Sequence, residues 1–281
     1  MIPLLVAAAL SFTEVHAIQA YNTASEIVRE CTPRDPGTIR GELAANFILD
    51  RASGTGADVR RDVFKAMSAG IEQRFVNLYA EYCSNPTGEW TVVLSHYDTK
   101  PGVACPGAND GASTSGLLVA LCSALNEWRT PRGNVMLVWT DGEECYSAYG
   151  TNDGLHGSKR AVEYLTAKNR KVRAAICLDM LGDRDLHITL PRNGSPTLKK
   201  IAHYAAGQIG EKDLVSDMRE HVRDDHVPFL DAGIPAVDLI DFSYGPGNSW
   251  WHTPSDTLDK ISKASLRKSG MLVCAMLEVL L

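Results

Sequence analysis

Side chains that can bind a metal ion follow three short apolar runs of the sequence. The runs are VVLSHYD, VMLVWTDGEE and AICLDM, and the metal-capable residues at their ends are His96, Asp98, Asp141, Glu143, Glu144 and Asp179. Asp110 follows the first run in PGANDGAS, before a helical pattern, and His252 lies in the later segment NSWWHTPSDT. Because the carboxyl ends of parallel strands lie at one edge of a sheet, we expect these side chains to converge there.

This set of side chains suits zinc. A catalytic zinc site takes three protein ligands and leaves one position for water or substrate, and Asp110, Glu144 and His252 would supply two oxygens and one nitrogen. His96 and Asp179 could complete a second site with Asp110 as a bridge, and metal pairs about 3.5 to 4 Å apart are a known hydrolytic arrangement. Glu143 then remains free to act as an acid and base.

Each residue also has a purely structural interpretation. Asp110 could be only the cap of a helix, and His252 could be an ordinary hydrogen-bonded loop residue. Adjacent glutamates such as Glu143 and Glu144 are usually solvated, but here they follow the buried-looking run VMLVWT, where like charges are costly without a partner. Their joint placement after successive apolar runs favours a metal site.

The elements that would position these residues alternate between strand and helix. A helix is predicted from Thr38 to Arg51, and paired strands are predicted at Ala57 to Phe64 and Arg74 to Tyr82. From Thr91 onward, short apolar runs alternate with helical patterns up to the final helix through MLVCAMLEVLL. This order predicts a three-layer α/β/α sandwich with a mostly parallel, mixed central sheet.

Composition restricts the class of protein and of partner. The 281 residues are 44% hydrophobic and 22% charged, with no repeat or linker, so residues 18–281 are expected to form a single catalytic domain. The net charge of −6 gives no basic surface for nucleic acid or for anionic membranes. We therefore expect a monomer that acts on small soluble or peptide substrates, without stable membrane insertion.

The N-terminus and the cysteines bear on the cellular compartment. Residues 1–17 contain an apolar run and a possible cleavage site at Val15 to Ala17, which favours a signal peptide and a secreted or periplasmic protein. However, no positive charge precedes the run, as it would in a typical signal peptide. The alternative is that this segment is a helix packed on the domain. Seven cysteines without CxxC spacing argue against a structural zinc ribbon. A disulfide between Cys31 and Cys83 is the pairing that we expect.

The sequence resembles metallopeptidase clan MH, which contains zinc aminopeptidases and the animal-type glutaminyl cyclases. The resemblance runs from about Thr32 to the C-terminus. Six segments carry it, in the family's order: HYD at 96–98, GANDGAS at 107–113, DGEE at 141–144, LDMLG at 178–182, DDHVPF at 224–229 and WHTPSDT at 251–257.

The resemblance implies two different uses of the same residues. In the aminopeptidases the residues that match His96, Asp110, Glu144, Asp179 and His252 bind two zinc ions, and the one that matches Glu143 activates water. In the cyclases the residues that match Asp110, Glu144 and His252 hold a single zinc ion, while counterparts of His96 and Asp179 are retained. The identity of the ligands therefore does not separate the branches. Asp98 matches a residue that usually orients the ligand histidine.

Three features resemble the cyclases more closely. The segment CYSAYGTNDGLHGS after Glu144 looks like their active-site loop. Asp224 matches an aspartate of the cyclases that hydrogen-bonds to the counterpart of Asp179. Such a hydrogen bond would discourage a second metal ion at Asp179, and it would give Asp179 and Asp224 a role in catalysis. Trp251 resembles their pocket tryptophan.

Other positions depart from the cyclase pattern. Tyr149 stands near a tryptophan of the animal enzymes, and Asp238 replaces a histidine, as in bacterial relatives; both are expected to contact the substrate. Ser95 and Ser115 lie where some members have a disulfide.

The resemblance favours a zinc-dependent glutaminyl-peptide cyclotransferase, which converts the N-terminal Gln of a peptide or protein into pyroglutamate with loss of ammonia. The alternative is an aminopeptidase with two zinc ions. A binding protein that has lost catalysis would have a broken ligand set or no general base, and neither is seen. Another amide-directed activity of the clan would need a basic residue for a substrate carboxylate, and Arg223 is the candidate for it.

Overall fold

A mixed sheet of eight strands forms the middle layer of the computed structural model, which describes residues 9–128 and 133–281. The strands are β1 (Val59–Ser68), β2 (Ile71–Tyr82), β3 (Trp90–His96), β4 (Asn134–Thr140), β5 (Val172–Asp179), β6 (Ile188–Leu190), β7 (Val215–Asp217) and β8 (Ala236–Ile240). Their order across the sheet is β1-β2-β4-β3-β5-β8-β6-β7. The mixed sheet expected from the sequence is therefore confirmed.

The four central strands are parallel, and they are the strands that lead to the candidate ligands. β4, β3, β5 and β8 pair in parallel register, whereas β1, β2 and β6 join the sheet by antiparallel pairings. β3 and β4 are buried along their whole length. Continuous apolar runs are typical of strands that are covered on both faces, which is why the sequence predicted this part of the sheet correctly.

The outer hairpin of β1 and β2 is the pair of strands predicted at 57–64 and 74–82, although β1 extends four residues further. Ala69 and Gly70 form its two-residue turn, with φ of 49° and 84°. Positive φ at both turn positions matches the right-handed twist of the strands on either side, so the turn fixes the register.

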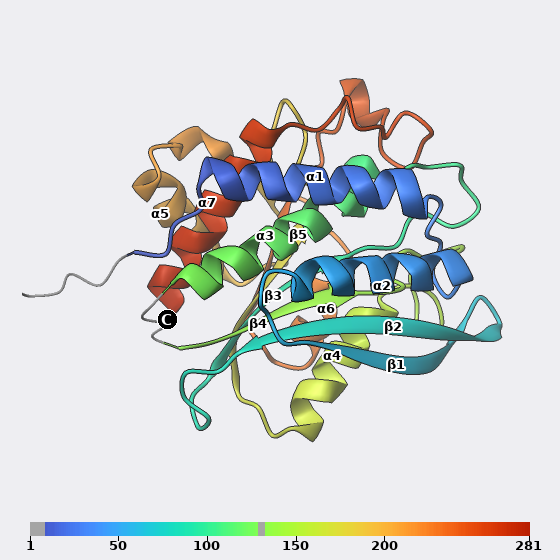
Figure 1. Ribbon diagram of the computed structural model, residues 1–281, viewed down its shortest axis with the longest axis horizontal. Helices are drawn as coiled ribbons and strands as arrows, with labels where there is room; N and C mark the ends of the chain where they lie inside the picture. The colour runs from blue at the N-terminus through green and yellow to red at the C-terminus, as the bar shows by residue number, and fades with distance from the viewer. Residues whose placement is uncertain (1–8, 129–132) are drawn as a thin grey trace, which may run out of the picture.

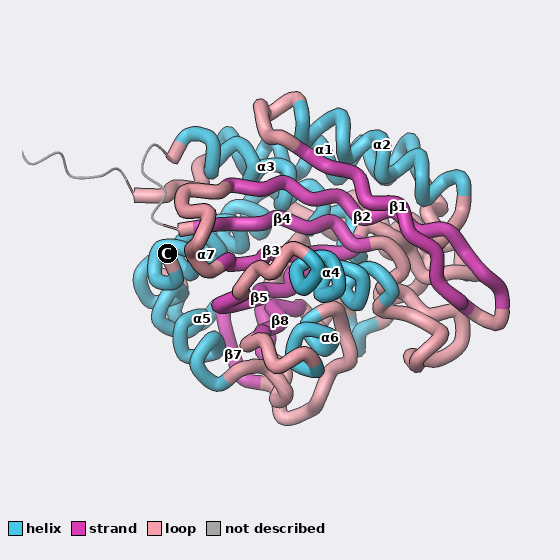
Figure 2. Tube along the Cα trace, turned by 90° about the horizontal axis from the view of Figure 1, so that it is seen from below, coloured by secondary structure: helices cyan, strands magenta, loops and turns pink. Residues whose placement is uncertain are grey.

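Helices cover both faces of the sheet. They are α1 (Glu14–Cys31), α2 (Ile39–Ser53), α3 (Thr114–Glu127), α4 (His156–Ala167), α5 (Pro196–Gln208), α6 (His226–Asp231) and α7 (Lys263–Leu280). α4 and α6 cover one face, and the other helices share a core with the opposite face (Figures 1 and 2). The predicted α/β/α sandwich is therefore confirmed.

Strand alternation explains the two cores. Successive side chains of a strand point to opposite faces of the sheet. In β4, Val135, Leu137 and Trp139 belong to the larger core under α1, α3 and α7, whereas Met136 and Val138 pack toward α4. Both sides of the strand are thus apolar from Val135 to Trp139, and the polar residues lie at its two ends and beyond.

The possible cleavage site lies within the first turn of α1. His16 and Ala17 are buried, and α1 packs against α3 and α7, as in the alternative interpretation of this segment. Residues 1–8 of the expected signal peptide lie outside the described residues. Export therefore stays a prediction. Among the described helices, none has both the length and the apolar content needed to cross a bilayer.

The predicted disulfide between Cys31 and Cys83 is wrong, because all seven cysteines are free. The two residues lie near opposite ends of the central strands. Thr32, next to Cys31, donates its hydroxyl to Pro106 O near the candidate ligands, whereas Ser84, next to Cys83, donates its backbone N–H to Asn134 at the start of β4. A disulfide requires Cα atoms within about 7 Å.

Candidate active site

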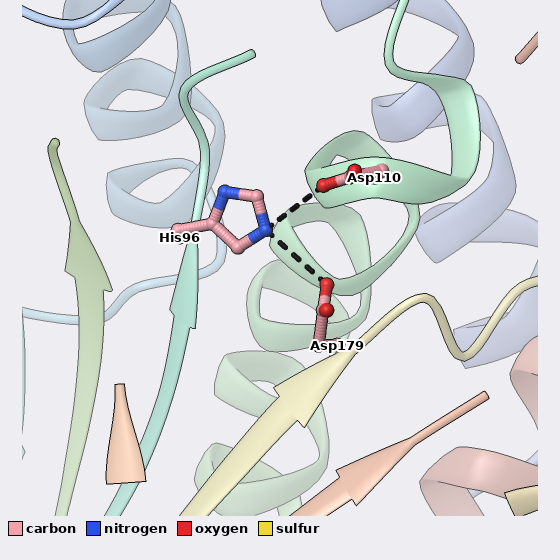
Figure 3. A group of neighbouring side chains, drawn as sticks. All are labelled: His96, Asp110 and Asp179. Carbon is pink, nitrogen blue, oxygen red and sulfur yellow. Dashed lines mark hydrogen bonds and ion pairs between the residues drawn. The ribbon is translucent and has the colours of Figure 1, made fainter. Parts of the chain in front are cut away.

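The candidate ligands meet at the carboxyl edge of the central strands, as expected. His96 and Asp179 are the last residues of β3 and β5, and Asp141, Glu143 and Glu144 follow directly after β4. Figure 3 shows the ring of His96 facing both Asp110, in the turn before α3, and Asp179, at the end of its strand. All of these residues are buried.

Asp110 is positioned by a buried network around its loop. It lies in a short π-helical turn, Ala108–Ser113, before α3. Asp256 accepts hydrogen bonds from the backbone N–H groups of Asn109 (2.8 Å) and Asp110 (3.2 Å). On the other side of the loop, the fully buried Arg34 donates to the carbonyl oxygens of Pro106 and Gly107. A buried cation and a buried anion thus hold the segment that carries Asp110.

Close backbone packing brings this loop against His96. A Cβ atom at Gly111 would lie 2.5 Å from His96 O and 2.9 Å from His96 Cε1. A larger residue at position 111 would therefore push Asp110 away from His96. Gly111 of GANDGAS is therefore explained by its close contact with His96 and not by its backbone conformation.

Asp110, Glu144 and His252 form the first group of potential ligands. His252 Nε2 lies 2.6 Å from Glu144 Oε1 and 3.3 Å from Asp110 Oδ2. His252 has φ of 55°, a left-handed conformation that is uncommon for a residue with a side chain and that is found at functional sites. The backbone conformation therefore turns the imidazole toward the two carboxylates.

His96, Asp110 and Asp179 form the second group (Figure 3). His96 Nε2 lies 3.1 Å from Asp110 Oδ1 and 3.2 Å from Asp179 Oδ1. Asp110 thus directs one oxygen to each histidine, which is the geometry of a bridging carboxylate. The structure brings together all five residues that the sequence analysis proposed as ligands.

The charges at these groups fit bound cations. Burial alone would lower the pKa of His252, but its hydrogen bonds with Asp110 and Glu144 outweigh burial and raise the pKa to about 9. For Asp110, burial favours a raised pKa, but the two histidines hold it below the usual range. Each histidine thus fills a place where positive charge is favoured, and oxygen and nitrogen donors of this kind suit zinc.

Glu143 lies beside this centre and touches a different partner. Its Oε1 atom accepts a hydrogen bond of 2.9 Å from the Tyr149 hydroxyl. Burial raises the pKa of Glu143 well above its usual value, and the charges of Glu144 and Asp224 add to the effect. A carboxyl group with a raised pKa can both accept and return a proton near neutral pH.

Asp98 connects the histidine of β3 to the glutamate pair. It lies 3.6 Å from His96 Nδ1 and accepts backbone N–H groups from Glu143 and Glu144, at 3.3 and 3.0 Å. It therefore lies where an orienting residue for His96 was expected, but its hydrogen bonds go to the glutamate backbone. His96 Nδ1 has no hydrogen-bond partner in the described part of the chain.

A cavity of about 450 Å³ opens onto these residues. Tyr149 and Trp251, which the sequence analysis placed in the substrate pocket, both line it, together with Ile240 and Phe242. Trp251 stacks on His252, with ring centroids 4.0 Å apart, and packs against Phe242. The cavity therefore has an acidic floor and an aromatic wall.

The expectation that Asp238 contacts the substrate is corrected by the structure. Asp238 is fully buried, and it is not among the residues that line the cavity. It lies opposite Cys177 within the sheet, two residues before β8 ends, whereas Ile240 at the strand end reaches the cavity. Burial and the charge of Asp224 raise the pKa of Asp238 well above its usual value.

Asp224 lines the cavity, but its expected hydrogen bond with Asp179 is not formed. Asp179 pairs with His96, and Asp224 accepts from the Cys177 thiol (3.5 Å) and from the backbone N–H of Asp225. Two ionised carboxylates repel, so each takes a donor elsewhere. They still interact, because burial and then the charge of Asp179 raise the pKa of Asp224 to about 7.

The sequence analysis missed the residues that support the ligands. Lys100 Nζ lies 3.5 Å from Glu144 Oε2 and donates to Cys145 O at 2.6 Å. Tyr244 donates its hydroxyl to Asp256, and Arg34 lies under the Asp110 loop. Lys100 lies two residues after the recognised segment HYD, and Asp256 lies within the recognised segment WHTPSDT, so their positions were a usable signal; no such signal marks Arg34 or Tyr244.

Comparison with known proteins agrees with this geometry. A model of peptidase family M28 matches residues 77–277. A glutaminyl-peptide cyclotransferase of Drosophila melanogaster is 27% identical over an alignment of 272 residues, which covers 86% of this chain and 75% of that protein. An aminopeptidase of Bacillus subtilis is 30% identical over 192 residues, which cover 65% of this chain and 39% of that protein.

Solved structures resemble the whole chain. The crystal structure of a glutaminyl cyclase from an Acidobacteriales bacterium has a TM-score of 0.88 and 29% identity, and the match covers 97% of this chain and 96% of that one. A leucine aminopeptidase precursor from Bacteroides thetaiotaomicron has a TM-score of 0.84 at 23% identity, covering 97% and 99%. The second likeness concerns the fold alone.

Proposed function

This chain belongs to peptidase family M28, and from that premise we propose that it is a zinc-dependent glutaminyl-peptide cyclotransferase. The reaction joins the α-amine of an N-terminal Gln to its own side-chain carbonyl and releases ammonia. The observation that carries the proposal is the likeness to cyclases over nearly the full chain, in sequence and in structure. The position of Glu143 in an acidic, partly aromatic cavity supports it.

Asp110, Glu144 and His252 are the residues that would hold the zinc ion. When bound there, zinc supplies a Lewis acid for the side-chain amide oxygen of the substrate. Glu143 takes a proton from the attacking α-amine and delivers one to the departing ammonia. Its raised pKa suits both transfers, because a catalytic acid and base works best when its pKa lies near the working pH.

The other lining residues bind and orient the substrate. Asp224 and Asp179 offer negative charge to the amine, and burial raises the pKa of Asp179 to about 6. Trp251 supplies an apolar face for the aliphatic stem of Gln, and Tyr149 holds Glu143 in place and narrows access of water. Excluding water matters, since water would compete with the amine for the amide carbonyl.

An aminopeptidase is the second candidate, and one observation favours it. His96, Asp110 and Asp179 lie together as a second group of potential ligands, which two co-catalytic zinc ions would use. In that case Glu143 would activate water, and the acidic lining residues would bind the free α-amine of any N-terminal residue.

A product assay separates the two functions. Zinc-loaded protein and a chelator-treated control are incubated with one peptide that begins with Gln and one that begins with Leu, and the products are measured by mass spectrometry. Loss of ammonia from the Gln peptide alone supports the cyclase. Release of the first residue from either peptide contradicts it, and the zinc content per chain then shows whether both groups are filled.

Two further properties belong to the same proposal. We propose that the enzyme is exported and that it works as a monomer on peptide or protein N-termini. Support for export is the apolar N-terminal run in the sequence. N-terminal sequencing of the mature protein and size-exclusion chromatography with light scattering test these two points.

A further inference from the structure

The charges that line the cavity are strongly uneven. The lining carboxylates are Asp110, Glu143, Glu144, Asp179, Glu220 and Asp224. Arg223 is the lining residue with a permanent positive charge, and it directly precedes Asp224. A peptide that enters with its amine first would therefore pass one fixed cation on its way to an acidic floor.

The backbone on both sides of Arg223 is held in place. Asn193 donates its amide to Val222 O at 2.9 Å and accepts the backbone N–H of Val222 at 3.1 Å. Asp224 accepts from the backbone of Asp225 through its side chain and from Val227 through its own carbonyl oxygen. The backbone that carries Arg223 into the lining of the cavity is thus fixed.

The guanidinium group of Arg223 is unused within the protein. Arg223 is exposed, and it makes no hydrogen bond or ion pair with any of the described residues. Many surface arginines are solvated in this way and have no function. The position of Arg223 distinguishes it, because this residue also borders a second depression.

A shallow groove of about 290 Å³ runs between α4 and α6. Its apolar lining residues are Leu155, Val162, Val227, Pro228 and Ala232. Lys159 and Arg223 add positive charge, and Asp231 is the one acidic residue that lines the groove. Arg223 lines both the cavity and the groove, so the two depressions meet at this residue.

Lys159 adds to the positive charge beside Arg223. Lys159 lies in α4, and its ammonium group donates to the carbonyl oxygens of Gly150 and Gly154, at 2.9 Å each, in the loop that carries Tyr149. A carboxylate near Arg223 would therefore be attracted by two cations, Arg223 and Lys159. The guanidinium group of Arg223 has hydrogen-bond donors that no other described residue uses. A planar guanidinium can bind a carboxylate through two parallel hydrogen bonds.

We propose that Arg223 binds a substrate carboxylate that lies downstream of the reacting N-terminal residue, and that the apolar groove receives the residues after it. This inference rests on the proposed action on peptide N-termini. Arg223 lines the same cavity as Glu143 and His252, so we place the carboxylate on one of the first residues after the N-terminus. The substrate class is a peptide with an acidic residue near its start, followed by apolar residues.

The test compares amidated peptides that differ at one downstream position. Glu, Gln or Lys is placed at the second, third or fourth position behind an N-terminal Gln, followed by Leu. We expect kcat/KM to be about three- to tenfold higher with Glu than with Gln at the best position, mainly through KM, and to be lowest with Lys. The preference should weaken at high salt, because exposed charges are screened.

Two variants assign the preference to its residue. Arg223→Gln should bring the ratio between the Glu and Gln peptides close to one, and Arg223→Glu should reverse the order of the Glu and Lys peptides. Arg219→Gln is the matched control, because Arg219 is exposed in the same loop but does not line the cavity. It should keep the wild-type ratio.

The outcomes separate this inference from the proposed function. Equal rates for Glu and Gln peptides in the wild-type protein, or a ratio that survives Arg223→Gln, would overturn the inference while cyclisation stands. The same downstream sequences are also placed behind Leu, so that the Arg223 comparison can be read if the enzyme proves to be an aminopeptidase. Peptides with a free C-terminus show whether a terminal carboxylate can replace the side chain.

Discussion

The Tyr149 hydroxyl donates a hydrogen bond to the carboxyl group of Glu143, with 2.9 Å between Oη and Oε1. This bond favours the ionised form of Glu143 and fixes the carboxyl group in the cavity. We expect Tyr149→Phe to lower kcat on the order of tenfold or more, since a hydrogen bond to a charged group contributes about 1.5 to 3 kcal/mol. The pKa of Glu143 should rise further, so the acid limb of the pH–rate profile should move to higher pH.

Tyr146→Phe is the matched control for this prediction. Tyr146 lies in the same loop, but its hydroxyl donates to Pro36 O, away from Glu143. Its variant should retain the wild-type pH profile. A Tyr149→Phe enzyme with unchanged kcat and pH profile would show that Glu143 is positioned by other contacts.

His252→Ala should remove zinc together with activity. His252 supplies the only nitrogen of the first group, next to Asp110 and Glu144, and its loss leaves two buried carboxylates beside each other. We expect the dialysed variant to contain about one zinc ion per chain fewer than the wild type, as measured by elemental mass spectrometry. His203→Ala, on the exposed side of α5, is the control. Full zinc retention in His252→Ala would exclude His252 from the ligand set.

The parts of the site that the sequence predicted share one physical origin. His96 and Asp179 end long apolar runs, and a polar residue that follows a buried strand has a defined place at the sheet edge. Asp110 and His252 lie in loops, so periodicity alone did not fix their place; their residue types suggested the cluster and the resemblance to a family supported it. Both kinds of inference identified residue positions correctly.

The errors concern how side chains contact one another across the fold. Asp238 lies in a strand, and the sequence does not show how far back from the strand end a cavity reaches. The partner of Asp224 depends on donors from β5 and the adjacent backbone. Cys31 ends α1 near the candidate ligands, whereas Cys83 follows β2 near the start of β4. Such contacts join residues far apart in the chain, and no local pattern encodes them.

Asp256→Asn should weaken zinc binding without changing a ligand. Asp256 accepts the backbone N–H groups of Asn109 and Asp110 and lies four residues after His252, so it aligns ligands from two loops. An amide would point its own N–H groups toward one of these donors. Because such supporting partners typically affect metal affinity by 10- to 100-fold, we expect zinc transfer to a chelator to be faster by roughly that factor.

The cobalt-substituted protein gives a second measure of the same effect. Its visible absorption reports the arrangement of the ligands, and we expect Asp256→Asn to change it. Asp259→Asn, an exposed site in the same loop, should leave both measurements as in the wild type. If Asp256→Asn binds zinc as tightly as the wild type does, Asp256 stabilises its loop but does not align the zinc ligands.

Burial of His226 should make stability depend on pH. Burial lowers the pKa of His226 to about 4, and its Nε2 atom accepts from Asn193 at 2.8 Å, while Nδ1 lies 3.7 Å from Asp238. The unfolded chain binds a proton at this residue near pH 6.5. Between pH 6.5 and 4 the unfolded state therefore holds more protons, and the free energy of unfolding falls as the pH is lowered.

His226→Gln removes this titration and keeps a polar side chain. We expect the stability difference between wild type and His226→Gln to shrink by up to about 3 kcal/mol as the pH falls from 6.5 to 4. Asp224 and Asp225, whose burial raises both pKa values to about 7, act in the opposite direction but equally in both proteins. Urea unfolding at several pH values measures the difference, with His203→Gln as a control. Parallel curves for wild type and His226→Gln would mean that folded and unfolded His226 take up their proton at the same pH, which would contradict this prediction.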